Sequence, residues 1–298
     1  MTVDPNGTNH TYVVDSVKLP VKAGEGSKYG LDLDGDGKVD NALGQILAAL
    51  SSAAGSGSFD LQPTIDKQVN SGSIILLANV KATALDMANG VALQVYLGTN
   101  PSPAPCTDPN DDTTCGKHLA GTGTFDVDTT GPTDAIMVGK IIGAQFTGGP
   151  GKVTLKLSLS GAPVQLDLIG ARAKLGGVTD TAIGSDASPG VIGGAITQAD
   201  LDSKVIPAVV STFNDQIDTN CPKPLDTTKA DCGCTGGTTT IISLFDKAPT
   251  HDCNITVDEL KNNDLISTLL APDVSINGVE ALSVGVGVTT VKGTFTVP

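Results

Sequence analysis

Residues 152–170 read KVTLKLSLSGAPVQLDLIG, two runs of alternating apolar and polar residues separated by a short turn. In the first run Val153 and Leu155 point to one face, while Thr154 and Lys156 point to the other. A period of two with one apolar and one polar face is typical of a half-buried antiparallel strand. The stretch therefore predicts a β-hairpin, and with it a β-rich fold.

The same alternation recurs in other parts of the chain, at residues 91–97, 282–288 and 291–295. In the second run of the opening stretch the parity changes after Gly170, so that Arg172 and Lys174 face solvent. A change of parity within one strand indicates an extra residue on one side of the ladder. We therefore expect a β-bulge near Gly170.

Three segments have helical spacing instead, at residues 41–50, 197–218 and 257–270. The second contains Pro207, which should kink it. In the third, Thr256 and Glu259 have the spacing of a capping box, in which each side chain satisfies a backbone N–H of the first turn. These segments predict about three α-helices packed on the strands.

Strands with a few packed helices favour a mainly β fold, either an antiparallel β-sandwich or a strongly curved sheet. No Pro/Ser-rich linker separates the parts, so we expect one domain over residues 1–298. Its expected parts are an acidic loop and helix (30–50), a β core (72–196), a kinked helix (197–218), a disulfide-rich loop (219–253) and a C-terminal helix with strands (254–298).

The charge of the chain restricts its partners. Thirty-two acidic residues stand against 18 basic ones, a net charge of −14, and Arg172 is the only arginine. Nucleic acid is therefore a poor partner, whereas divalent cations are attracted. No apolar run approaches the roughly 20 residues of a membrane-spanning helix, so we expect no membrane span. No export signal precedes Thr2, so we expect a processed form of the chain.

Six cysteines lie in Pro-, Asp- or Gly-rich stretches, where surface disulfides are common: Cys106, Cys115, Cys221, Cys232, Cys234 and Cys253. The first two are close enough in sequence to form one bridge. The other four allow three pairings, of which Cys232 with Cys234 is the least favourable. Disulfides predict an oxidising compartment, so we expect a secreted, cell-surface or periplasmic protein.

An acidic loop provides the strongest functional signal. Its expected metal ligands are Asp32, Asp34, Asp36, the Lys38 carbonyl and Asp40, with Gly37 at the turn. Alternate residues of a tight loop point inward, and Ca²⁺ prefers six to eight oxygen ligands. Four clustered carboxylates without a cation would repel one another. The loop therefore predicts a calcium site, although an Asp/Gly turn that only caps the next helix is the alternative.

The loop resembles the EF-hand-like calcium loops of FG-GAP repeats, dockerins and thrombospondin type 3 repeats over about a dozen residues. The resemblance implies a structural calcium site that orders the helix after it. The loop departs from the EF-hand at its twelfth position, where Leu43 replaces the bidentate glutamate. Either another carboxylate or carbonyl oxygen completes the coordination, or the site is weak.

A second segment, 246–260, looks like an EF-hand loop with two extra residues and Cys253 in the place of glycine. The resemblance implies calcium ligands at Asp246, Asp252, Asn254, Thr256 and Glu259. The alternative is that Thr256 and Glu259 only cap a helix. A third stretch, 273–280, has the same spacing with fewer charges, and we expect only a turn there.

The chain as a whole is also similar to uncharacterised exported lipoproteins of Gram-negative bacteria. The similarity lies in the acidic loop followed by Asn41-Ala-Leu-Gly and in the Cys-Asn-Ile-Thr-Val-Asp-Glu-Leu segment. It implies export and carries no information about activity.

Catalytic chemistry has little support in the sequence. The three histidines, His10, His118 and His251, are expected at the surface rather than as general bases. We therefore expect a non-enzymatic, calcium-stabilised, disulfide-bonded protein of the envelope or extracellular space, acting in adhesion, assembly or scaffolding. The Val-rich C-terminal strand suggests self-association through an exposed edge.

Two alternatives stay open. The first is a secreted, calcium-dependent hydrolase without the usual motifs. The second is a carrier of lipid or another apolar ligand, because some strands have apolar residues on both faces, as at Ile74, Ile75, Leu76 and Leu77.

Overall fold

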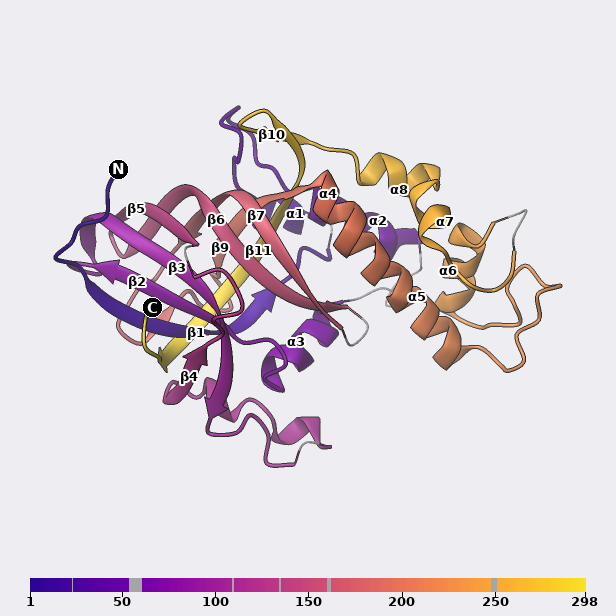
Figure 1. The fold of residues 1–298 in the computed structure, drawn as a ribbon, viewed down its shortest axis with the longest axis horizontal. Helices are drawn as coiled ribbons and strands as arrows, with labels where there is room; N and C mark the ends of the chain where they lie inside the picture. Colours follow the sequence, from indigo (N-terminus) through magenta and orange to yellow (C-terminus); the bar gives the residue numbers. More distant parts are fainter. Residues whose placement is uncertain (23, 54–60, 109, 134, 160–161, 248–250) are drawn as a thin grey trace.

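A computed structural model describes residues 1–22, 24–53, 61–108, 110–133, 135–159, 162–247 and 251–298. Its centre is a closed barrel of eight antiparallel strands (Figure 1). The barrel strands are β1 (Thr8–Lys18), β2 (Leu76–Ala82), β3 (Met87–Ser102), β5 (Ile136–Ile142), β6 (Gln145–Leu159), β7 (Ala162–Leu175), β9 (Gly190–Thr197) and β11 (Val279–Thr294). They pair in that order around the barrel, with β3 next to β5 and β7 next to β9.

The barrel closes where its first and last strands meet. β1 pairs with β11 from Tyr12 opposite Lys292 to Lys18 opposite Gly287. The expected sandwich or open curved sheet is therefore wrong. The alternation of apolar and polar residues identifies strands, but it does not identify which strand pairs with each edge. Here β1 and β11 come from opposite ends of the chain. Because β11 also pairs with β9, its backbone does not provide the long exposed edge expected for self-association.

The opening stretch forms the hairpin that its alternation predicts. Val153 pairs with Leu168 and Leu155 with Leu166, while the turn between the strands lies outside the described residues. The bulge near Gly170 is confirmed, because the β7–β9 register shifts between Ile169 and Arg172 and Gly170 has a φ of 61°. Glycine adopts such left-handed backbone without strain.

Three short strands lie outside the barrel wall: β4 (Gly123–Val127), β8 (Ala182–Ile183) and β10 (Val274–Ile276). A small outer core of Val13, Ile75, Leu77, Tyr96, Phe125 and Phe295 includes residues of β4 and of the C-terminus. Ile74 and Leu76 belong instead to the main core, which includes the barrel interior. The apolar residues on both faces of this segment are thus explained by two separate cores.

The described residues contain eight α-helices, more than the three expected: α1 (Glu25–Lys28), α2 (Ala42–Ala53), α3 (Gln62–Asn70), α4 (Gln198–Asp200), α5 (Ile206–Asn220), α6 (Gly237–Phe245), α7 (Val257–Lys261) and α8 (Asp264–Leu269). The predicted segment 41–50 corresponds to α2. Segment 197–218 is divided by a π-helical turn, Leu201–Val205, just before Pro207. Segment 257–270 is divided where the Asn263 side chain caps α8. The two divisions lie near single residues, Pro207 and Asn263. Neither residue much alters the spacing of apolar residues that predicted one continuous helix in each segment.

Most of the helices gather at one end of the barrel, which we call the helical cap: α2 and α4 to α8 (Figure 1). Ile46 and Leu47 of α2, Phe213 of α5 and Leu260 of α7 belong to the same core cluster as the barrel interior. Within the cap, Phe213 stacks on Phe245 with ring centroids 5.2 Å apart and planes 13° apart. The interior of the barrel is thus closed at this end by side chains rather than by strands.

Asn41 joins the acidic loop and α2 to the barrel. Its side chain donates to the Gly285 carbonyl at 3.0 Å and accepts from the Gly285 N–H at 3.0 Å. It also donates to the Gly26 carbonyl at 3.1 Å. Gly285 lies just before the residues of β11 that pair with β1, so the Asn41 amide takes the place of a neighbouring strand.

Replacing Asn41 by alanine should lower the free energy of unfolding by about 3 kcal/mol. The change leaves both backbone groups of Gly285 without their side-chain partner, and a buried unsatisfied polar group costs about 1–3 kcal/mol. Urea denaturation of the variant measures the loss. Asn262→Ala, at an exposed position, is the control and should change stability by less than about 0.5 kcal/mol. Equal effects in the two variants would contradict this account.

Candidate functional site

The acidic loop lies outside the barrel and brings three of its four carboxylates together. Oxygens of Asp32, Asp34 and Asp40 lie within 4.8 Å of one another. Asp32 also accepts the N–H groups of Gly35 and Gly37, at 2.6 and 3.1 Å. Both glycines have a φ near 90°, as a tight metal-binding loop requires.

Asp36 does not belong to this group of carboxylates. It accepts the Lys38 N–H at 2.7 Å and forms an ion pair with the Lys38 ammonium at 2.9 Å. These hydrogen bonds lower the pKa of the Asp36 carboxyl. Burial and, to a smaller extent, the charges of nearby carboxylates raise the pKa of Asp40. A bound cation would relieve that repulsion.

The loop is attached to the barrel wall by apolar and polar contacts. Leu33 packs with Ala195 and Ile276 in a small core on the outer face of the barrel. The Leu33 N–H donates to Asp40 at 2.7 Å, and the Leu33 carbonyl accepts from Arg172 Nε at 3.4 Å. The predicted turn 273–280 lies beside it and forms the β10–β11 hairpin. These contacts fix the position of the loop on the barrel wall.

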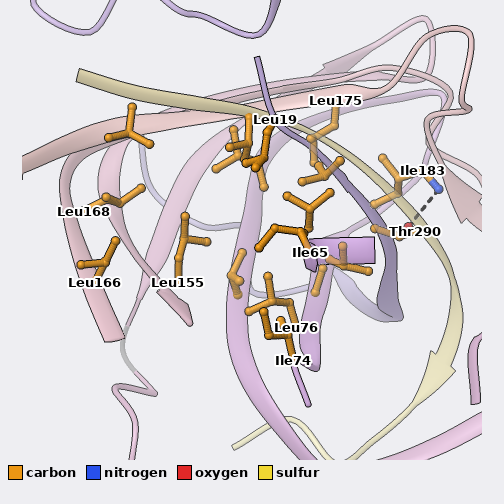
Figure 2. A pocket seen from close by; sticks show the side chains of 18 of the residues that line it. Leu19, Ile65, Ile74, Leu76, Leu155, Leu166, Leu168, Leu175, Ile183 and Thr290 are labelled. Atoms are coloured by element: carbon orange, nitrogen blue, oxygen red, sulfur yellow. Dashed lines mark hydrogen bonds between the residues drawn. The ribbon is translucent and has the colours of Figure 1, made fainter. Parts of the chain in front are cut away.

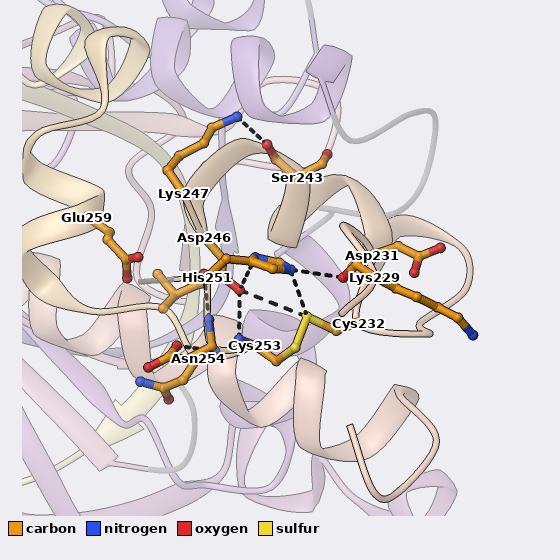
Figure 3. A network of polar contacts seen from close by, with 12 residues as sticks. Lys229, Asp231, Cys232, Ser243, Asp246, Lys247, His251, Cys253, Asn254 and Glu259 are labelled. Carbon is orange, nitrogen blue, oxygen red and sulfur yellow. Dashed lines mark hydrogen bonds and ion pairs between the residues drawn. A yellow bond between two sulfur atoms is a disulfide. The ribbon is translucent and has the colours of Figure 1, made fainter. Parts of the chain in front are cut away.

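The second acidic segment surrounds a buried carboxylate, shown in Figure 3. Asp246 accepts the N–H of Cys253 at 2.8 Å and that of Asp252 at 3.3 Å, and its other neighbour is His251 Nδ1 at 2.9 Å. His251 Nε2 lies 2.9 Å from the Lys229 carbonyl. Because both ring nitrogens face acceptors, the pKa of His251 is raised, first by the Lys229 carbonyl and then by Asp246.

The other expected ligands of this segment are engaged elsewhere. Glu259 accepts from the Thr256 N–H and hydroxyl at 2.9 and 2.8 Å, so the capping box is confirmed. Asp252 accepts the Asn254 N–H at 3.0 Å. Cys253 has a φ of 66°, the conformation favoured by the glycine that it replaces in the EF-hand pattern. The segment thus has the backbone turn of such a loop, while its calcium ligands stay a prediction.

Three disulfides are present, and they settle the pairing that the sequence left open. The pairs are Cys106–Cys115, Cys221–Cys234 and Cys232–Cys253. The last two link the C-terminal end of α5 to the loops on both sides of α6. They indicate a non-cytoplasmic, oxidising compartment.

Of the three histidines expected at the surface, only His118 is buried. His10 and His251 are partly exposed and lie next to Asp180 and Asp246. His118 is fully buried against Phe125, with ring centroids 6.2 Å apart. Its ring nitrogens have no hydrogen-bond partner of normal geometry among the described residues. Burial therefore lowers the pKa of His118, and the Val69 backbone opposes this only in part.

The feature that the sequence did not locate is a pair of neighbouring apolar cavities that share part of their lining, which we call the inner and the outer lobe. The inner lobe, about 50 Å³, lies inside the barrel and is lined by residues such as Leu76, Leu155, Leu168 and Leu175 (Figure 2). The outer lobe, about 140 Å³, lies under the helical cap between α2, α5, α7 and α8. Five residues line both lobes: Leu19, Leu43, Ile65, Leu166 and Val284.

The few hydroxyl groups in the lining are already hydrogen-bonded. Thr290 accepts the Ile183 N–H at 3.0 Å, as Figure 2 shows, and Thr212 donates to the Ala208 carbonyl at 2.9 Å. All other lining residues are apolar. The cavity therefore suits a hydrocarbon group and has no group positioned for chemistry.

Comparisons with known proteins found no similar protein. The sequence matches no protein-family model, and neither a curated protein nor a solved structure matches the chain. Among the described residues, no helix has both the length and the apolar character needed to cross a membrane.

His118 should make the protein less stable in mild acid. Its folded-state pKa lies below the unfolded value of about 6.5, so unfolding takes up a proton once the pH falls below that value. Its contribution reaches at most about 1.4 kcal/mol per pH unit. Urea denaturation between pH 7 and pH 5 should show a shallower loss of stability in His118→Phe. His10→Phe, at a partly exposed position, is the control, and the same pH slope in wild type and His118→Phe would refute the assignment.

Proposed function

We propose that this protein binds an apolar ligand inside its barrel and beneath the helical cap. The observation that carries the proposal is the two-lobed cavity, whose lining has no free polar group. Closed barrels commonly hold small ligands in their interiors or mouths. Of the three functions that the sequence left open, only the carrier makes use of this feature; adhesion or scaffolding and hydrolysis stay predictions from the sequence.

The size of the outer lobe supports the proposal energetically. At about 24 cal/mol per Å³, an empty cavity of 140 Å³ costs about 3 kcal/mol relative to a filled one. That is a large share of the 5–15 kcal/mol that stabilises a typical protein. Valines line part of the lobe, where leucine or phenylalanine could fill it. A bound hydrocarbon would recover this energy.

Disulfides and calcium would then stabilise the frame around the cavity. Two disulfides hold the cap segments together, and the acidic loop leads through Asn41 into α2, which lines the outer lobe. Secretion, or residence in the periplasm or at the cell surface, fits an oxidising compartment. We propose Ca²⁺ at Asp32, Asp34 and Asp40, with Asp36 and the Lys38 carbonyl as further ligands after the Lys38 ion pair breaks.

Octanoate should bind with one-to-one stoichiometry and raise the melting temperature, because its chain removes the empty volume from the core. Isothermal titration calorimetry should also show a negative heat-capacity change, the mark of apolar burial. Val209→Phe, which fills the outer lobe, should weaken binding at least tenfold. Val279→Phe, the same change at an exposed position, should not. If neither octanoate nor benzene binds saturably, the proposal fails.

Calcium should stabilise the protein by about 2.7 kcal/mol at a free concentration 100 times its dissociation constant. Asp34→Asn should remove most of this effect, because Asp34 is exposed and serves the ion rather than the core. Asp215→Asn makes the same change on an exposed face of α5 and is the control. Thermal denaturation with calcium or with a chelator measures the difference. Identical melting curves under both conditions would remove the calcium site from the proposal.

A further inference from the structure

The two lobes differ in size and position, and this difference constrains the shape of a ligand. We propose that the ligand is a single unbranched hydrocarbon chain of about six to eight carbons, whose length is measured by the inner lobe of the barrel. The inference rests on the proposed function, because it specifies the ligand of the same cavity.

The volumes set the length. A cavity of about 150 Å³ lined by aliphatic residues accepts benzene, a guest of six carbons. On that scale the outer lobe holds about six carbons, and the inner lobe holds roughly two more. The inner lobe is therefore too small for a ring and accepts only the end of a chain.

The position of the lobes gives the direction of the chain. The inner lobe lies among the barrel strands, whereas the outer lobe is lined mostly by helices of the cap. A chain therefore enters beneath the cap and passes Leu19, Leu43 and Val284 before its end reaches the barrel interior. Opening a route through the wall would break ladder hydrogen bonds, while a route through the cap displaces side chains.

The polarity of the lining places the head group. Neither Thr212 nor Thr290 has a hydroxyl directed to a ligand, because each is engaged with the backbone. A buried carboxylate without a partner is strongly unfavourable. The polar end of the ligand must therefore lie on the side of the cap, away from the barrel interior.

Calorimetric titrations with n-alkanoates from butanoate to dodecanoate test the length directly. Affinity should rise about fourfold for each methylene group up to about eight carbons and then level off or fall. Cyclohexylacetate should bind in the outer lobe only. A steady rise to dodecanoate would overturn the length limit while leaving the proposed function intact, and failure of every alkanoate to bind would overturn both.

Two small substitutions in the inner lobe should change the chain length that binds most tightly, and they should change it in opposite directions. Ala78→Val fills part of the lobe and should shorten the best chain by one or two carbons, and Val286→Ala should lengthen it. Neither should alter the affinity for cyclohexylacetate. Val80→Ala removes the same volume as Val286→Ala from a buried position that does not line the cavity, so its optimum should equal that of wild type. If the same chain length binds most tightly in all four proteins, the inner lobe does not determine the length of the ligand.

Discussion

The pairing of β1 with β11 is the interaction on which the rest of the structure depends. It joins the two ends of the chain and turns a row of strands into a closed barrel. Closure removes the unpaired edges that an open sheet would expose, and it separates an interior from solvent. Without this pairing the inner lobe would be one face of a sheet, and the helical cap would have no opening to cover.

The place where this pairing ends determines what can be attached to the barrel. β1 leaves β11 after Lys18, and the backbone of Gly285 is then satisfied by the Asn41 side chain. A side chain at Gly285 would collide with the Tyr29 carbonyl, so glycine is required at this close approach. Asn41 follows the acidic loop directly and precedes α2. The acidic loop outside the wall and a helix lining the cavity are therefore fixed through one residue.

Local patterns predicted local structure well. The hairpin of β6 and β7, the bulge near Gly170, α2 and the capping box at Thr256 all depend on residues within a few positions of one another. Closure of the barrel could not be predicted in this way, because periodicity is equally satisfied by a sandwich. The cavity was hidden for the same reason: Leu166 and Val284 have the pattern of ordinary core residues, and only the fold places an empty volume between them.

The apolar segment at Ile74–Leu77 is a case in which the sequence and the structure support the same proposal for different reasons. Its two apolar faces suggested a ligand carrier, but Ile75 and Leu77 pack in the outer core beneath β4. Only Ile74 and Leu76 face the cavity. The carrier proposal therefore rests on the volume of the cavity rather than on the hydrophobicity of this segment.

The barrel wall is a continuous hydrogen-bonded ladder, whereas the cap consists of short helices joined by loops and two disulfides. On the proposed function, a ligand would therefore exchange through the cap, where two disulfides link the end of α5 to the loops on both sides of α6.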